Sequence, residues 1–137
     1  MARVVVERSI ATPLDRVKSA ITDVESFLRS AGFDSVAVDG DSIVIKNHVG
    51  LLTIRLDCRL VTDDGALLAY EQIDGIFDAM HTRYTVETAS DERVTVVGET
   101  TFTLDARFLG PLLDATVVSR QRRRELEAQF DYLEALD

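Results

Sequence analysis

Residues 52–60 read LTIRLDCRL, with an apolar side chain at every second position from Leu52 to Leu60. The positions between them hold threonine, arginine, aspartate and arginine. A period of two is typical of a β-strand that buries one face and leaves the other in water. The stretch therefore predicts a sheet with one apolar face, which another element of the chain has to cover.

More strands are predicted on both sides of this stretch. Residues 4–10 are rich in β-branched side chains, and the period of two returns from about Ser35 onward. The turns between strands are short, so the strands are expected to be antiparallel. The predicted strands after the first cover 36–38, 43–46, 52–60, 67–74, 79–88 and 94–104, with turns at Asp39-Gly40-Asp41, Asp63-Asp64-Gly65 and Asp91-Glu92.

Two short helices are predicted after the first strand. Apolar residues recur at three- and four-residue spacing from Leu14 to Val24, which indicates an amphipathic helix that runs to about Thr22. Thr12 fits its N-cap position and Pro13 its first turn. A second helix follows Asp23, which we expect to cap it, and closes at Gly32.

A long helix is predicted from Leu109 to Leu136, with Pro111 in its first turn. At about 100° per residue, one stripe of this helix faces the sheet. Small residues near the middle of the stripe predict open space beneath the helix; the alternative is that an aromatic side chain of the sheet fills it. The stripe consists of Leu112, Ala115, Ser119, Leu126, Phe130 and Leu133.

The composition is that of a globular protein, and we expect residues 1–137 to form one domain. Hydrophobic residues make up 46% of the chain, but no run approaches the roughly 20 residues of a membrane helix. The charged N-terminus does not resemble a secretion signal, and a single cysteine, Cys58, rules out an intrachain disulfide. These features predict a cytoplasmic protein with no stable membrane insertion.

The chain is strongly acidic, with a formal net charge of −9. Such a surface repels phosphate backbones, so nucleic acid is not an expected partner. Lys18 and Lys46 are the only lysines among 15 basic residues. This composition resembles that of proteins from salt-accumulating cells; the alternative is a mildly acidic protein from a GC-rich genome.

The order of elements resembles the START-like (SRPBCC) superfamily, which includes polyketide cyclase-like proteins, lipid-transfer START domains and plant pathogenesis-related ligand carriers. Residues 10–17, IATPLDRV, and 21–25, ITDVE, look like the opening of that family. Residues 70–75, YEQIDG, look like its strand that ends in an acid–glycine pair, and Tyr84 stands where the family often has tryptophan. The resemblance implies an α+β helix-grip fold: an antiparallel sheet of about six to seven strands wrapped around a long C-terminal helix, with two short helices after strand 1.

The resemblance also implies a pocket between the sheet and the C-terminal helix. Its wall is expected to be mostly apolar with a few polar groups, as in small-molecule sites. We expect Arg123 to be the cation nearest the inner stripe; it would pair a carboxylate ligand, or else pair a protein acid or extend outward to solvent. Its arginine neighbours are expected to be solvated. The predicted ligand-binding residues are Tyr70, Gln72, Met80, Tyr84, Phe102, Ser119 and Arg123.

Catalytic and metal-binding motifs are not apparent in the sequence. Cys58 lies at a buried position of its strand and is interpreted as inert core. His48 and Asp74 would make an acid–base pair only if they met across the pocket. The histidines and the cysteine lack metal-ligand spacing, and no phosphate-binding glycine motif occurs, so we expect no metal and no cofactor.

Three functions fit these observations. The first is a protein that binds or carries a small apolar or lipid-like molecule without catalysis. The second is an enzyme similar to polyketide cyclases and aromatases, working in the same pocket. The third is a protein-interaction module, such as a homodimer formed through a sheet edge.

Overall fold

The computed structural model describes residues 1–90 and 92–136. The predicted fold class and order of elements are confirmed. The turn predicted at Asp91-Glu92 includes Asp91, which lies outside the described residues. The elements are β1 (Ala2–Ile10), α1 (Leu14–Thr22), α2 (Val24–Arg29), β2 (Ser35–Asp39), β3 (Ser42–Val49), β4 (Leu52–Leu60), β5 (Leu68–Asp74), β6 (Phe77–Ser90), β7 (Arg93–Leu104), the short 3₁₀ helix η1 (Ala106–Phe108) and α3 (Ala115–Glu134).

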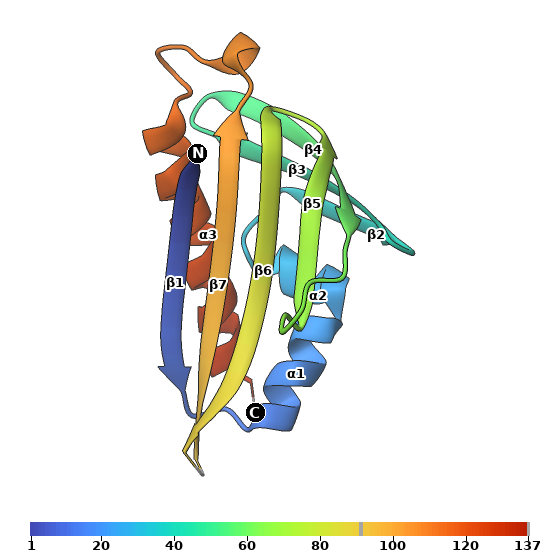
Figure 1. Cartoon of the computed structure of the whole chain (residues 1–137), viewed down its shortest axis with the longest axis vertical. Helices are drawn as coiled ribbons and strands as arrows, with labels where there is room; N and C mark the ends of the chain where they lie inside the picture. The colour runs from blue at the N-terminus through green and yellow to red at the C-terminus, as the bar shows by residue number, and fades with distance from the viewer. Residues whose placement is uncertain (91, 137) are drawn as a thin grey trace.

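The seven strands form one antiparallel sheet in the order β1-β7-β6-β5-β4-β3-β2. Strands β2 to β7 follow one another as a meander, and β1 pairs with β7. The long helix α3 packs against β1 and β7 and also touches β3, far along the strand order. The sheet therefore curves around α3, as Figure 1 shows.

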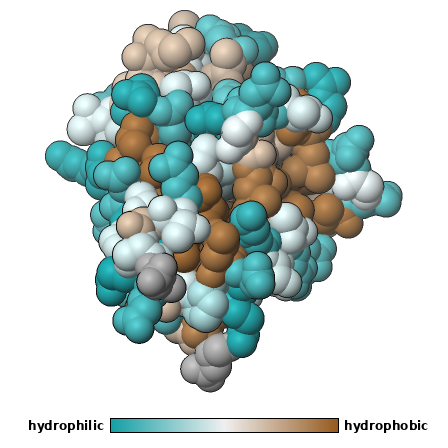
Figure 2. All heavy atoms as spheres, turned by 60° about the horizontal axis from the view of Figure 1, so that its bottom comes forward, coloured by the Kyte–Doolittle hydropathy of each residue, from teal (hydrophilic) through white to brown (hydrophobic). Residues whose placement is uncertain are grey.

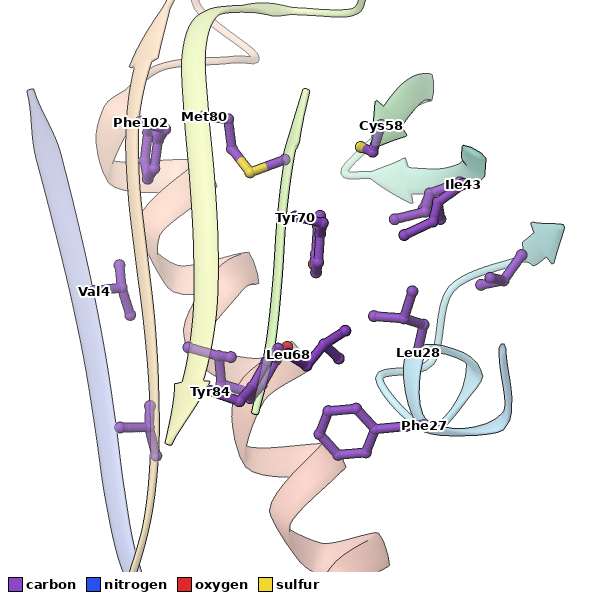
Figure 3. Packing of buried hydrophobic residues seen from close by; sticks show 14 of the residues in the cluster. Val4, Phe27, Leu28, Ile43, Cys58, Leu68, Tyr70, Met80, Tyr84 and Phe102 are labelled. Carbon is purple, nitrogen blue, oxygen red and sulfur yellow. The ribbon is translucent and has the colours of Figure 1, made fainter. Parts of the chain in front are cut away.

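Buried residues alternate with more exposed ones along the strands, and the buried ones form the core on the concave face of the sheet. In β7 every second residue from Val94 to Leu104 is buried, and in β3 Ile43 and Ile45 are buried. Apolar burial at this spacing is what the sequence pattern requires. Figure 3 shows core residues drawn from strands across the sheet and from α2, among them Val4, Phe102, Met80, Tyr70, Cys58, Ile43, Phe27 and Leu28.

Helix α3 begins at Ala115 and not at Leu109 as predicted. Gly110 and Leu113 form a backbone bridge, with N–H···O distances of 3.0 and 3.2 Å, so Pro111 lies in a turn. The side chain of Asp114 caps the helix by accepting a hydrogen bond from the backbone N–H of Val117 at 2.9 Å. An aspartate at this position satisfies a helix N–H that has no partner within the helix, so the helix starts there.

The start of α1 also differs from the prediction. Pro13 occupies the N-cap position, and Thr12 does not cap the helix. The Thr12 hydroxyl instead donates to the backbone carbonyl of Leu133 at 2.7 Å, which ties the β1–α1 connection to the end of α3. Asp23 precedes α2 as predicted, but its side chain makes no capping hydrogen bond.

Gly98 lies in the interior of β7, where α3 crosses the sheet. A Cβ atom built on it would lie 2.9 Å from Leu126 Cδ2 and 3.2 Å from Phe130 Cζ, both on α3. These distances are too short for a side chain, so glycine lets the helix approach the strand closely.

The outer surface is predominantly polar. Figure 2 shows one face, where apolar patches are interrupted by polar side chains. Exposed ion pairs join neighbouring strands, among them Arg3–Glu99 and Arg59–Glu71. No helix in the described ranges 1–90 and 92–136 combines the length and apolarity needed to cross a membrane.

Candidate functional site

A narrow cavity lies between α3 and strands β3 to β6. Nine of its lining residues are apolar: Phe33, Ile45, Val49, Ile54, Leu56, Ile76, Phe77, Met80 and Val118. Five are polar: Asn47, Tyr70, Gln121, Arg122 and Glu125. An apolar wall with a few polar groups is the usual composition of a small-molecule site.

The cavity is small as it stands. Its volume is about 40 Å³, which is room for roughly three water molecules. A larger ligand would therefore need the side chains of the wall to move apart. Met80 and Phe33 lie in that wall, and methionine adapts readily because its chain is unbranched.

The polar lining residues converge on Glu125, which lies on α3 and is only 3% exposed. Its Oε1 accepts a hydrogen bond from Arg122 Nη1, one turn earlier on the helix. Its Oε2 accepts from Asn47 Nδ2 at 2.9 Å and from Gln121 Nε2 at 3.0 Å. Both carboxylate oxygens are thus bound by donors from α3 and from β3, which compensates for burying the charge.

Arg122 is buried as well. Together with Asn47, Gln121 and Glu125 it forms a polar cluster, which Arg122 connects to the sheet. Its Nη2 donates to Thr82 Oγ1 at 3.1 Å, and the Thr82 and Thr100 hydroxyls are 2.8 Å apart. Burial acts to lower the pKa of Arg122, but the neighbouring Tyr70 and Glu125 outweigh it and raise that pKa. Arg122 therefore keeps its charge, and Arg122 and Glu125 form a buried ion pair.

The two predicted tyrosines have different surroundings. Tyr70 lines the cavity, whereas Tyr84 lies deeper in the core, edge-on to Phe27 with ring centroids 4.9 Å apart (Figure 3). The Tyr84 hydroxyl donates to Gln129 Oε1 at 2.6 Å, and Gln129 Nε2 donates in turn to the carbonyl of Phe27 at 3.4 Å. Burial raises the pKa of both tyrosines, so both hydroxyls stay protonated.

Of the other predicted site residues, only Met80 lines the cavity. Gln72 binds the backbone of Phe77, donating to its carbonyl at 2.8 Å and accepting from its N–H at 3.1 Å, and so shapes the β5–β6 turn. Phe102 packs on Phe77 in the core, with ring centroids 5.3 Å apart. Ser119 is half-buried and lies outside the cavity lining.

The prediction that Arg123 is the cation on the inner face of the helix is wrong. Arg123 is exposed, and its Nη1 donates to the carbonyl of Val5 on edge strand β1 at 3.4 Å. Arg122, which we expected to be solvated, is the buried cation. The predicted stripe is correct at Leu126, Phe130 and Leu133, which are buried, and wrong at Leu112, Ala115 and Ser119, which are not. In the first half of α3 the buried residues are Val118 and Arg122.

His48 and Asp74 do not form an acid–base pair. His48 lies near Asp34 and Thr53, bound through Nδ1 to the aspartate and through Nε2 to the threonine hydroxyl at 3.1 Å. In the sheet, His48 stands opposite Thr53 and Asp74 opposite Asp57. Those two partners are four residues apart on β4, a spacing of about 13 Å along a strand.

Cys58 is buried in β4, as expected for an inert thiol. Burial raises its pKa to about 12, so the reactive thiolate is not populated near neutral pH. Among the residues that the structure describes, no three histidine, cysteine, aspartate or glutamate side chains gather in a way that would hold a metal ion.

Sequence comparison finds no matching family model and no matching curated protein. Solved structures match over nearly the whole chain. The ZhuI aromatase/cyclase from Streptomyces sp. R1128 has a TM-score of 0.78 at 21% identity, covering 97% of this chain and 93% of that one. A protein from Thermus thermophilus has a TM-score of 0.75 at 23% identity, covering 97% and 94%.

A START superfamily protein from Mycobacterium smegmatis has a TM-score of 0.71 at 12% identity, covering 96% of this chain and 94% of that one. At such identities the likeness concerns the fold. It agrees with the observed element order, the seven-stranded sheet and the long terminal helix. The protein therefore has the helix-grip fold of the START-like (SRPBCC) superfamily.

Proposed function

We propose that this protein binds a small apolar molecule in the cavity between α3 and strands β3 to β6, without catalysing a reaction. The observation that carries the proposal is the composition of the cavity wall, which is apolar except for Tyr70 and the cluster of Asn47, Gln121, Arg122 and Glu125. An apolar wall favours transfer of a hydrophobic body from water, and a localised polar group can fix its orientation.

The chemistry of the polar cluster favours binding over catalysis. Glu125 accepts hydrogen bonds on both oxygens, one of them from an arginine, so neither oxygen is free to take a proton from a ligand without losing a bond. Burial raises the pKa of Tyr70, and a catalytic acid or base works best with a pKa near the working pH. The cluster is therefore better suited to holding a ligand than to moving its protons.

A second candidate function is the cyclisation of a polyketide-like chain. It is favoured by the likeness to an aromatase/cyclase and by two donors, Tyr70 and Arg122, that line the cavity. Incubation with a poly-β-ketone thioester, followed by mass spectrometry, tests this candidate. Loss of water from the thioester that depends on Tyr70 would favour the enzyme over the binding protein.

Binding can be tested with N-phenyl-1-naphthylamine, a neutral apolar dye that fluoresces in dry surroundings. We expect saturable one-to-one binding by the native protein. Val118→Phe should weaken binding at least about tenfold, because the larger ring occupies the cavity. Val117→Phe is the matched control, since its position is half-buried on the same helix but lies outside the lining.

Two results would contradict the proposal. One is the lack of saturable dye binding by the native protein. The other is equal weakening by Val118→Phe and Val117→Phe, which would place the dye elsewhere or reduce the effect to general destabilisation.

A further inference from the structure

The polar cluster carries no net charge, which limits what it can recognise. Arg122 and Glu125 neutralise each other. Glu125 receives hydrogen bonds from Arg122, Asn47 and Gln121, so its oxygens are already well engaged. A ligand therefore meets the cluster mainly through the donors of Arg122 and its neighbours.

Arg122 has donors to spare. A guanidinium has five N–H groups, and the described residues engage one on Nη1 and one on Nη2. Arg122 is also part of the cavity lining. Within residues 1–90 and 92–136, no side-chain nitrogen or oxygen is both buried and without a partner. Each of the other N–H groups of Arg122 therefore belongs to a nitrogen that already makes a hydrogen bond or to a nitrogen that is not fully buried.

Tyr70 supplies a second donor beside Arg122. Its ring lines the same cavity. Burial raises its pKa, and the charge of nearby Arg122 partly opposes that rise. The hydroxyl is therefore protonated at neutral pH, and Tyr70 shares the cavity wall with Arg122.

We infer that the cavity selects neutral ligands that carry a carbonyl oxygen, which accepts hydrogen bonds from Arg122 and Tyr70, over carboxylates of the same shape. This inference rests on the proposed function and names the chemical class of its ligand. A carboxylate would bring a second negative charge beside buried Glu125, where like charges repel strongly. A pure hydrocarbon would displace water from the N–H and O–H donors of Arg122 and Tyr70 without accepting a hydrogen bond from them. Its binding free energy would therefore be less favourable.

The test is displacement of N-phenyl-1-naphthylamine by three compounds of similar shape: 2-acetylnaphthalene, 2-ethylnaphthalene and 2-naphthoate. In the native protein the ketone should bind at least about tenfold more tightly than the ethyl compound, the usual size of a hydrogen bond to a charged group. The naphthoate should bind more weakly than the ketone. The double variant Arg122→Met/Glu125→Met should lose the preference for the ketone, so that the ketone and the ethyl compound bind about equally.

The outcomes separate this inference from the proposed function. If the dye binds but the ketone and ethyl compounds compete equally, or the naphthoate competes best, the selection of neutral carbonyls is wrong and the binding function stands. If the double variant keeps both dye binding and the ketone preference, another group recognises the carbonyl and the inference is overturned. If the native protein does not bind the dye, both proposals fall together.

Discussion

The ion pair between Arg122 and Glu125 is the least expected feature of the core. Arg122 is 7% exposed and Glu125 3%. Two charges leave water at a cost of several kcal/mol each, and only their attraction and further hydrogen bonds offset it. Asn47, Gln121 and Thr82 supply those bonds. Removing one charge alone should therefore be far more harmful than removing both.

Arg122→Met should lower the free energy of unfolding by about 3–5 kcal/mol, because Glu125 would remain buried and charged without its partner. The double variant Arg122→Met/Glu125→Met should recover most of that loss. Arg123→Met is the matched control and should change stability by no more than about 0.5 kcal/mol, since its side chain is exposed. Urea denaturation measures all three; a larger loss for Arg123→Met than for Arg122→Met would contradict the account.

Cys58 gives a second test of packing at the level of one residue. Its pKa is raised to about 12 by burial, so at pH 8 the thiolate is scarce and shielded. Iodoacetamide should label the native protein very slowly at that pH and label it fully in concentrated urea. Rapid labelling of the native protein would mean that β4 opens readily or that Cys58 is not in the core.

Arg122 is buried and Arg123 is exposed, which is the reverse of the prediction from the sequence. Periodicity assigns an arginine to solvent unless a partner is known, and Thr82, which accepts a hydrogen bond from Arg122, comes from a strand that is distant in sequence. The predicted stripe fails in the first half of the helix, at Ala115 and Ser119, but holds at Leu126, Phe130 and Leu133. The sequence did contain one usable signal: Glu125 lies three residues after Arg122, the spacing of a pair on one helix face.

At the level of elements, α3 is held against the sheet by contacts along its length. Gly98 lets its middle approach β7. Near its end, Arg8 of β1 binds Asp131 at 2.6 Å and Glu134 at 3.0 Å. The Thr12 hydroxyl binds the carbonyl of Leu133. Helix α3 is therefore held by two strands, β7 and β1, and by the β1–α1 connection.

Gly98→Ala should destabilise the protein by about 1–3 kcal/mol, the usual cost of overpacking. The added methyl group would lie 2.9 Å from Leu126 Cδ2 and 3.2 Å from Phe130 Cζ. Both side chains are fully buried, so the surrounding core restricts their movement. Gly110→Ala is the control: no atom lies within 4 Å of its added methyl group, so stability should be nearly unchanged. Thermal unfolding of both variants checks this, and equal melting temperatures would show that α3 does not pack closely on Gly98.

Most strands and helices could be predicted from the sequence. The alternation of apolar residues in a strand, and their three- to four-residue spacing in a helix, depend only on residues that are close together in the chain. The strand from Leu52 to Leu60 and the first helix to Thr22 have the expected bounds. The start of α3 could not be placed from periodicity, since Leu109 and Leu112 continue the apolar pattern although both are exposed. The cap formed by Asp114 decides the start, and aspartate is common in other positions too.

At the level of the whole molecule, charge opposes compactness. The net charge is −9, and many carboxylates lie on the surface. Added salt screens their mutual repulsion, over a Debye length of about 10 Å at 0.1 M and about 3 Å at 1 M. We expect the melting temperature to rise from about 0.05 M to about 2 M potassium chloride. A melting temperature that is flat or falls over this range would remove the idea of salt adaptation.

The fold as a whole could be predicted from element order, but the size and lining of the cavity could not. A sheet that curves around a helix encloses space, and side-chain packing decides how much of it stays open. Here Met80, Phe33 and Val118 leave only a narrow opening. Such packing depends on contacts among residues far apart in sequence, which periodicity does not report.

The most direct test of ligand binding follows the isoleucine δ1 methyl groups by NMR during titration with N-phenyl-1-naphthylamine. Ile45, Ile54 and Ile76 line the cavity, whereas Ile10 and Ile21 are buried outside it. We predict saturable shifts of the first three signals with one dye bound per chain, and little change in the other two. Shifts confined to Ile10 and Ile21, or no saturable shift at all, would contradict the central claim.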